Sequence, residues 1–373
     1  MIPIARPRLG LTERDRLLAV LDSGTLADGP EVREFETNFA DSCAASHGVA
    51  TSNGTTALHA ALVALGVEPG DHVVTTPFSF VATASVISHV GAEPVFADID
   101  PLTYNLDPHA VESALRADPD ITAILPVHLY GLPAAMDHFR DLADEYDCAL
   151  LSDAAQAHGA TYRGRPVGSH ADATCFSFYP TKNMTTGEGG MIVTDDSAVA
   201  ARARQFVDHG RTEGYEHVSL GHNFRLSSLG AAVGNAQLDK LPAFVGTRRD
   251  NAARLDEAVA GSDLRAPLEP PHREHAYHQY TVRCPPGERD AVADALESRG
   301  VASRVYYPTP IHQQPLYAGG PSAAEPLPFH GGDCPVAETA AEQVLSIPVH
   351  PGLTDEELAT VAEAVSSIRG VVA

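Results

Sequence analysis

ITAILPVHLYGLPAAMDHFRDLADEYDCALLSD, residues 121–153, is the stretch of sequence that decides the fold. It opens with an apolar run at 121–129, continues through an amphipathic run at 136–147 and closes with a second apolar run at 148–153. Short uninterrupted apolar runs are typical of strands buried on both faces, and the middle run has helical spacing. The stretch therefore predicts a strand, a helix and a second strand that ends at Asp153.

The same alternation extends to both sides of this unit. Further strands are predicted at HVVTTPF (72–78), PVFADID (94–100), TCFSFYP (174–180) and GMIVTDD (190–196), and a helix at ALHAALVAL (57–65). Strands that alternate with helices predict an α/β fold with a mostly parallel sheet between helices. Such sheets bind ligands at the carboxyl ends of their strands, which is where we look for a site.

The length of 373 residues exceeds what one compact core usually holds. We expect a large domain over residues 1–245 and a smaller C-terminal α+β domain over residues 246–373. The helical pattern at 223–259 predicts a helix that connects them, and TDEELATVAEAVSSI predicts a last helix over 354–368. The Gly- and Pro-rich stretch 310–335 predicts a long surface loop.

Charge and cysteine content exclude several classes of protein. The formal net charge of −24 repels nucleic acid and anionic membranes, so neither is an expected partner. Five cysteines without a CxxC pair, and an N-terminus without an apolar leader, predict the reducing cytoplasm. None of the 18 histidines shows a metal-ligand spacing, so no metal is expected.

Lysine is scarce in this chain. Lys182 and Lys240 are the only two, and arginine supplies the remaining positive charge. Codon usage in a GC-rich genome explains this composition. A salt-loving source explains it as well, since an acidic, lysine-poor surface stays soluble at high ionic strength, and we favour that explanation. Either way, any chemistry that needs a lysine has two candidates.

Asp153 and Lys182 are the strongest candidates for chemistry. A carboxylate at the tip of a buried strand is costly without a cation or hydrogen-bond donors, although it could merely cap the next helix. Lys182 follows a β-rich run and precedes a glycine-rich turn, where partial burial would lower the pKa of its amine; an exposed loop lysine is the alternative. Together they suit pyridoxal phosphate (PLP), with Asp153 at the pyridine nitrogen and Lys182 as the Schiff-base lysine.

Other residues could hold the rest of such a cofactor. The run TSNGTTALHAALVAL (51–65) predicts a helix start at which Gly54 and Thr55 offer donors to a phosphate, and Ser177 could donate to the same group. Phe78 and Phe80 end a predicted strand, where one of them could stack on the pyridine ring. Ordinary helix capping, strand pairing and core packing are the structural alternatives.

The chain resembles the sugar aminotransferases of the DegT/DnrJ/EryC1/StrS family over nearly its whole length. The resemblance rests on the order and spacing of many motifs, among them SGTLADGPEVREFETNFA (23–40), SNGTTALHAAL (52–62), DAAQAHGA (153–160), SFYPTKNMTTGEGGM (177–191), GHNFRLSSLGAAVG (221–234) and YYPTPIHQQPLY (306–317). It implies the fold type I of PLP-dependent transferases, with a large PLP-binding domain.

The resemblance also implies roles at the cofactor ring. Lys182 would hold PLP and then shuttle protons. Asp153 would pair with the pyridine nitrogen, Gln156 would contact the side of the 3-hydroxyl, and Phe80 would be the stacking aromatic.

At the phosphate, the resemblance implies contacts from Gly54, Thr55 and Ser177. It implies one more from Asn223 of the neighbouring subunit, so a homodimer with shared active sites is expected. His158 matches a family position to which we assign no role.

The implied reaction moves an amino group from L-glutamate to a keto group of a nucleotide-linked sugar. The run TTGEGGM (185–191) resembles members that act at C4 of 4-keto-6-deoxy sugars, and YPTKN (179–183) resembles members that act at C3; we favour C4. A cyclitol aminotransferase and a PLP sugar dehydratase remain alternatives, although a histidine in place of Lys182 would be expected for dehydration. An inactive PLP-binding regulatory subunit is the alternative outside enzymes.

Overall fold

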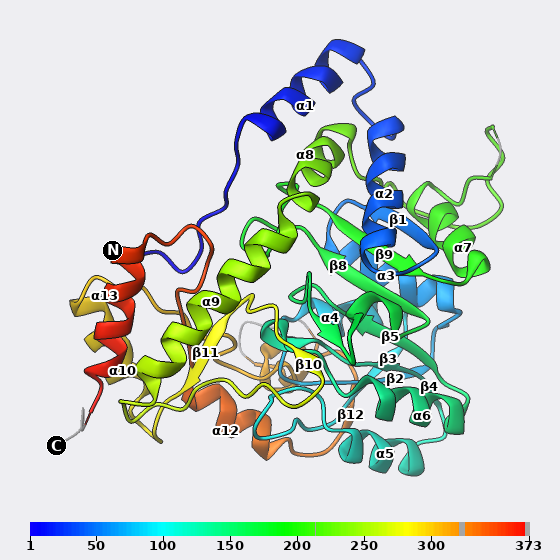
Figure 1. Cartoon of the computed structure of the whole chain (residues 1–373). Helices are drawn as coiled ribbons and strands as arrows, with labels where there is room; N and C mark the ends of the chain where they lie inside the picture. The colour runs from blue at the N-terminus through cyan, green and yellow to red at the C-terminus, as the bar shows by residue number, and fades with distance from the viewer. Residues whose placement is uncertain (213, 321–324, 370–373) are drawn as a thin grey trace.

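The computed structural model describes residues 1–212, 214–320 and 325–369. An eight-stranded sheet lies at its centre (Figure 1), in the order β1-β9-β8-β5-β4-β2-β3-β12. β9 is antiparallel to β1 and β8, and the other neighbouring pairs are parallel. The strands are β1 (His47–Thr51), β2 (His72–Thr75), β3 (Glu93–Phe96), β4 (Ile121–Leu125), β5 (Ala149–Asp153), β8 (Ala173–Ser177), β9 (Gly190–Thr194) and β12 (His330–Gly331).

Helices cover both faces of this sheet, because the strands are apolar on both sides. Val73 and Leu151 pack beneath α3 (Gly54–Leu65), α4 (Ala82–His89) and α7 (Ser197–Val207). Their neighbours Val74 and Leu150 face the other side and pack against α5 (Pro108–Ala117) and α6 (Met136–Tyr146). The predicted α/β fold with a mostly parallel sheet is confirmed, and residues 121–153 form β4, α6 and β5 as expected.

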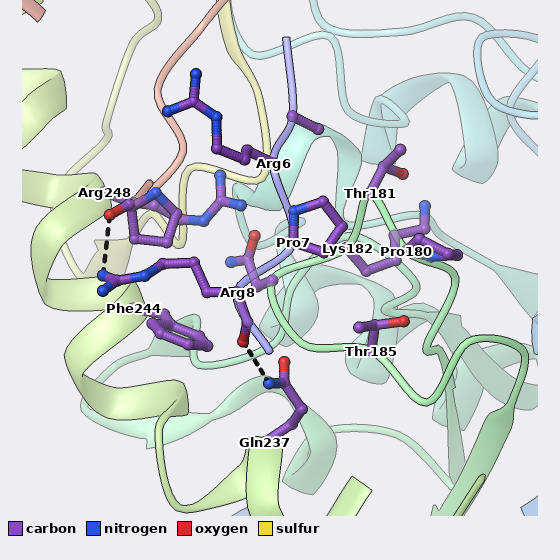
Figure 2. Close-up of a pocket in the computed structure, with 13 residues that line it drawn as sticks. Arg6, Pro7, Arg8, Pro180, Thr181, Lys182, Thr185, Gln237, Phe244 and Arg248 are labelled. Atoms are coloured by element: carbon purple, nitrogen blue, oxygen red, sulfur yellow. Dashed lines mark hydrogen bonds between the residues drawn. The ribbon is translucent and has the colours of Figure 1, made fainter. Parts of the chain in front are cut away.

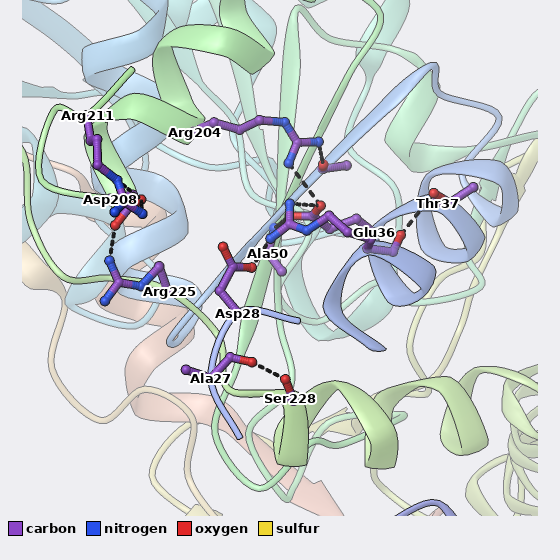
Figure 3. Close-up of polar contacts among 12 residues, drawn as sticks. Ala27, Asp28, Glu36, Thr37, Ala50, Arg204, Asp208, Arg211, Arg225 and Ser228 are labelled. Carbon is purple, nitrogen blue, oxygen red and sulfur yellow. Dashed lines mark hydrogen bonds and ion pairs between the residues drawn. The ribbon is translucent and has the colours of Figure 1, made fainter. Parts of the chain in front are cut away.

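The β1 edge is closed by α2 (Pro30–Ser42), which carries the buried carboxylate of Glu36. Glu36 accepts a hydrogen bond from the backbone N–H of Ala50 at 2.8 Å and pairs with Arg204 of α7 at 2.9 Å (Figure 3). Arg33, one turn before Glu36, donates to the same carboxylate. A buried carboxylate needs such donors, and here they tie α2 to β1 and α7.

The second lysine, Lys240, lies between two helices next to α2 and has a structural role there. α1 (Leu11–Ser23) stands away from the sheet and contacts α8 (Ser228–Leu238), as Figure 1 shows. Lys240, just after α8, donates to both carboxylate oxygens of the buried Glu13 on α1, at 2.5 and 2.7 Å. Lys240 therefore has a structural partner, which leaves Lys182 as the lysine available for chemistry.

The pattern at 223–259 forms two helices rather than one. α8 ends at Leu238, and α9 (Leu241–Val259) begins one residue before Pro242, which lacks the N–H that a helix continuing from α8 would need there. α9 crosses the predicted boundary between residues 245 and 246, and the division into domains at that point stays a prediction.

The C-terminal part has its own core of α and β elements. β11 (Tyr280–Arg283) pairs antiparallel with β13 (Val344–Ile347), and the second half of α9 packs with them. The helices of this part are α10 (Arg289–Ser298), α11 (Pro315–Ala318), α12 (Pro335–Gln343) and α13 (Asp355–Ser366). A small three-stranded sheet consists of β6 (Thr161–Tyr162), β7 (Arg165–Pro166) and β10 (Arg273–Glu274).

The stretch 310–335, predicted as a long loop, contains α11 and β12 among turns, while residues 321–324 lie outside the described part of the chain. Its strand β12 joins the edge of the large sheet beside β3. Within the described residues, no helix is both long enough and apolar enough to cross a membrane.

Candidate active site

The carboxyl ends of two neighbouring strands position the predicted site. β5 ends at Asp153 and β8 ends at Ser177, and the register of this parallel pair places Asp153 opposite Cys175. Lys182 follows five residues after Ser177, in a turn that leads into β9. The backbone N–H of Lys182 donates to the carbonyl of Tyr179 at 2.9 Å, which holds this turn.

Asp153 is buried, with 5% of its surface exposed. The hydroxyl of Thr83 donates to one carboxylate oxygen at 2.9 Å, and the backbone N–H of Ala155 donates to the other at 3.0 Å. Burial nevertheless raises the pKa of Asp153, since these two donors and the charge of Lys182 offset the lost solvation only in part. Such a carboxylate gains from a cation placed against it, and the protonated pyridine nitrogen of PLP is one.

Lys182 has an amine whose pKa burial lowers from 10.5 to about 8, although the negative charge of Asp153 acts in the opposite direction. A neutral amine is therefore accessible near neutral pH, as Schiff-base formation requires. The side chain of Asn183 donates to the backbone carbonyl of Ala276 at 2.9 Å and fixes the turn from its far side. Burial and a rigid turn thus give Lys182 the two properties that its predicted role needs.

The N-terminal segment passes behind the lysine turn. Figure 2 shows Arg6, Arg8 and Lys182 around a small cavity of about 20 Å³ that α9 also lines through Arg248. Arg8 donates to the carbonyl of Pro351 at 3.2 Å, and its own carbonyl accepts from Gln237 at 2.9 Å. A cavity of this size has room for about one water molecule, so a cofactor has to reach Lys182 from its exposed side.

The start of α3 fits a phosphate group. Asn53 caps the helix by accepting from the N–H of Thr56 at 2.9 Å, which leaves the first-turn amides of Gly54 and Thr55 as donors for an anion. Gly54 lies so close to β8 that a Cβ there would stand 2.7 Å from Cβ of Ser177. The missing side chain at Gly54 therefore lets the helix start lie close to the Ser177 hydroxyl; that the two hold a phosphate stays a prediction.

Gln156 and Phe80 lie in the part of the site predicted to hold the ring. Gln156 is buried, and its side-chain oxygen accepts from the backbone N–H of Tyr130 at 2.7 Å. Phe80 is 57% exposed beside the start of α4, whereas Phe78 is fully buried in the core. Of the two phenylalanines, only Phe80 has a free face, which suits the stacking role given to it.

Sequence reasoning missed two neighbours of these residues, Thr83 and Tyr307. The hydroxyl of Tyr307 accepts from the side-chain nitrogen of Gln156 at 3.0 Å, and its ring centroid lies 6.3 Å from that of Phe80. Tyr307 belongs to the C-terminal part, so no local pattern points to this contact. The aromatic pair in VASRVYYP (301–308) was its only signal, and such pairs are more often core residues.

His158 is buried beside the site, close enough to Lys182 for the charge of that lysine to help lower the pKa of its ring. Its ring packs among those of Phe39, Phe176 and Phe178, with centroid distances of 5.2 to 6.3 Å. Burial lowers the pKa of His158 to about 3, so the ring is neutral at physiological pH. The surroundings identify a core histidine, and no chemical role follows from them.

Asn223 is exposed, in a segment that leaves α7 and returns to the sheet. Asp208 anchors this segment through ion pairs with Arg211 and Arg225 (Figure 3). The carbonyl of Phe224 accepts from the N–H of Ser52 at 2.7 Å, which places the segment beside the approach to α3. Asn223 thus lies in a segment that contacts the residue before the cap of α3, and its own side chain is exposed.

This fold and site define a class, the PLP-dependent transferases of fold type I. The profile of the DegT/DnrJ/EryC1/StrS aminotransferase family matches residues 7–366, and the chain belongs to that family. It is a PLP-dependent sugar aminotransferase.

Three relatives illustrate the match. UDP-N-acetyl-3-dehydro-α-D-glucosamine 3-aminotransferase of Acidithiobacillus ferrooxidans is 40% identical, over 94% of this chain and 92% of its own. GDP-perosamine synthase of Caulobacter vibrioides is 37% identical, over 98% of each chain. The PLP-form of the sugar aminotransferase Spr1654 from Streptococcus pneumoniae superimposes with a TM-score of 0.90 at 28% identity, over 100% of both chains. PLP as the predicted cofactor is confirmed.

Proposed function

We propose that this aminotransferase moves an amino group from L-glutamate to C4 of a nucleotide-linked 4-keto-6-deoxy sugar. The observation that carries the amino transfer is the pair of Lys182, with a pKa of about 8, in the turn after β8 and the buried Asp153 at the end of the neighbouring strand β5. The position of amination rests on the run TTGEGGM (185–191), which begins three residues after Lys182.

PLP, when bound, takes up the electrons of a carbanion that forms beside its ring. Asp153 keeps a proton on the pyridine nitrogen, because a buried carboxylate is stabilised by a cation against it. Lys182 in its neutral form accepts the proton from the substrate carbon and returns it at another carbon. The amides at the start of α3 and the Ser177 hydroxyl hold the phosphate, so the ring keeps one position between these residues.

The active unit in this proposal is a homodimer in which Asn223 of one subunit completes the site of the other. Support comes from the apolar side chains beside it, since Tyr215 and Leu220 are each 94% exposed and Val218 is 57% exposed. Large apolar residues grouped in this way are typical of surfaces that bind a partner. A cytoplasmic location is part of the same proposal and is supported by five cysteines that are all unpaired.

Amination at C3 of the sugar is a second candidate for the reaction, because one relative and one motif favour it. The relative from Acidithiobacillus ferrooxidans is named as a 3-aminotransferase and shares 40% of its residues with this chain. The motif YPTKN around Lys182 also resembles C3 enzymes.

The test uses purified holoenzyme, L-glutamate and two substrates that differ only in the position of the keto group. The proposal expects 2-oxoglutarate and a 4-amino sugar from the 4-keto substrate, identified by NMR of the product. A 3-amino product from the 3-keto substrate alone would establish the second candidate instead. Release of ammonia without an aminated sugar would refute both and indicate a dehydratase.

A further inference from the structure

A second group of polar side chains gathers at the opposite end of the sheet from Lys182. His72 begins β2, Glu93 begins β3, and His330 lies on β12, which are three strands in neighbouring positions. Asp118 and Asp120 lie between α5 and β4, the strand on the other side of β2. The amino ends of four adjacent strands thus bring together residues from distant parts of the sequence.

The strand register puts the three strand residues on one face of the sheet. His72 is opposite Glu93, and His330 is opposite Val95, two residues after Glu93. Because side chains two apart on a strand share a face, His72, Glu93 and His330 all point to the same side. This side is the one that α5 and α6 cover, so the group lies at the rim of a packed core.

Contacts within the group are close. The rings of His72 and His330 lie 4.1 Å apart between centroids. Nε2 of His330 lies 2.6 Å from a carboxylate oxygen of Glu93, and Nδ1 of His72 lies 2.7 Å from one of Asp118. The ligand atoms of His72, Glu93 and His330 all lie within 4.8 Å of one another, and so do those of His72, Asp118 and Asp120.

We propose that His72, Glu93 and His330 bind a zinc ion. Two imidazoles and one carboxylate form a donor set that zinc accepts, and its tetrahedral ligand atoms stand about 3.4 Å apart. Ligand atoms up to 4.8 Å apart therefore have to approach by at most about 1.4 Å, while His330 and Glu93, now 2.6 Å apart, have to separate slightly. Asp118 holds Nδ1 of His72, which leaves Nε2 of that ring for the metal and orients it, as carboxylates beside metal-bound histidines do. Water supplies the fourth ligand.

The zinc site fastens β12 to the sheet. β12 has two residues and only β3 as a neighbour, so few backbone hydrogen bonds hold it. Ile311 precedes β12 in the stretch 310–335. Its N–H donates to the carbonyl of Pro77 at 2.7 Å, next to Phe78 and near Phe80. A metal that joins β12 to β2 and β3 therefore stabilises the C-terminal segment against the large sheet. The sequence predicts no metal because residues 72, 93 and 330 have no local spacing.

A second histidine group supplies a matched control. The ring centroid of His59 on α3 lies 5.9 Å from that of His89 on α4 and 5.7 Å from that of His222 in the segment after α7. In the described part of the chain, the ring nitrogens of these three histidines do not all lie within 4.8 Å of one another, whereas the ligand atoms of the proposed zinc site do. Non-specific zinc binding by clustered histidines would involve both groups, whereas a built site involves the first alone.

The experiment titrates zinc chloride into untagged, chelator-treated holoenzyme and follows the heat of binding. We expect one saturable site per chain, at least about tenfold weaker in His330→Gln and in Glu93→Gln, and about tenfold weaker in Asp118→Asn. His89→Gln should bind zinc like the unchanged protein. Absence of a saturable site, or equal affinity in His330→Gln, would overturn the proposal, as would loss of binding in His89→Gln.

Cobalt gives a readout that needs no variant. Co²⁺ added to the unchanged holoenzyme should give the intense visible bands of a tetrahedral site, and zinc should remove them by competition. A weak octahedral spectrum would count against the proposed ligands even where a variant fails to fold. Neither measurement depends on the sugar substrate.

Discussion

Asp153 and Asn223 are both expected to act on the same cofactor, yet their surroundings differ. Asp153 is buried at the end of β5, with donors from Thr83 and Ala155 that one chain supplies. Asn223 is exposed in the segment between α7 and α8, which also carries the exposed apolar side chains of Tyr215 and Leu220. Ser177 resembles Asp153 in this respect because it ends β8, and Lys182 is held by the turn that follows that strand.

This difference distinguishes contacts that the sheet of one chain positions from contacts that a second subunit is expected to supply. Residues at strand ends are held by the backbone on both sides, so their geometry exists before any ligand binds. The segment 208–225 is anchored at Asp208 through two arginines, while its apolar middle remains exposed. One chain is therefore expected to supply the contacts to the ring and most of those to the phosphate, and the remaining phosphate contact is expected from the second subunit.

The largest effect is expected when Lys182 is removed. Lys182→Ala should lower transamination by at least about 10⁴-fold, since both the attachment of PLP and proton transfer depend on this amine. The visible absorption of lysine-bound PLP should vanish as well. Lys240→Arg is the matched control, because it keeps the ion pair with Glu13 and should retain the band and most of the activity. A Lys182→Ala protein whose visible band still responds to glutamate would contradict the assignment.

Replacing Asp153 should have the next largest effect. Asp153→Asn should lower kcat by about 10²- to 10³-fold, since it removes the charge that keeps the ring protonated. It should also change the pH dependence of PLP uptake by the cofactor-free chain. Uptake requires the neutral amine of Lys182, so its rate should rise with pH through about 8 and then level off.

The charge of Asp153 raises the pKa of Lys182, so the midpoint of that pH profile should move to lower pH in Asp153→Asn. Thr83→Val keeps the charge and removes one hydrogen bond, and its midpoint should stay near that of the unchanged protein. Stopped-flow absorbance after mixing with PLP measures both profiles. A midpoint that stays in place in Asp153→Asn would show that the two groups are not coupled.

A smaller effect is expected at the partner side. Asn223→Ala should weaken PLP binding by about 10- to 100-fold, the range for one hydrogen bond to a charged group. If the side chain completes the site of the other subunit, mixed dimers of Asn223→Ala and Lys182→Ala chains contain one intact site. Random mixing should then restore about a quarter of the activity.

Each of those variants alone should stay impaired at the PLP concentration of the assay. Mixing would restore nothing if Asn223 served its own subunit, because every site would then lack either the lysine or the asparagine. Size-exclusion chromatography before and after mixing verifies that subunits exchange.

The sequence predicts the sheet well because its strands are short apolar runs, but it extends them too far. β2 stops at Thr75 although HVVTTPF continues to 78, since Pro77 has no N–H for the sheet and the chain turns towards the site there. Asp153 could be located because it ends such a run, and Ser177 because it precedes Lys182 by five residues. Their chemical roles stay predictions.

Contacts between distant segments could not be predicted in this way. Tyr307 meets Gln156 across 151 residues, and His330 meets Glu93 across 237 residues. Nothing in either local sequence encodes the partner, since the packing of the C-terminal part on the large sheet creates both pairs. The residues alone left Phe78 and Phe80 open and the family resemblance favoured Phe80; the structure adds a physical reason, because the core covers Phe78 and leaves Phe80 exposed.

Replacing Tyr307 should have the smallest effect. It also tests whether the C-terminal part contributes only support or takes part in the chemistry. Tyr307→Phe removes the hydroxyl that accepts from Gln156 at 3.0 Å, and a hydrogen bond of this kind contributes about 1 kcal/mol, so kcat/KM should fall about fivefold. The loss should be modest because Tyr130 still holds the oxygen of Gln156. Tyr306→Phe is the control: Tyr306 binds the hydroxyl of Tyr130 through its backbone carbonyl, which the substitution keeps. A loss beyond about 100-fold would mean that the Tyr307 hydroxyl contacts the reacting groups, and the C-terminal part would then supply chemistry as well as support.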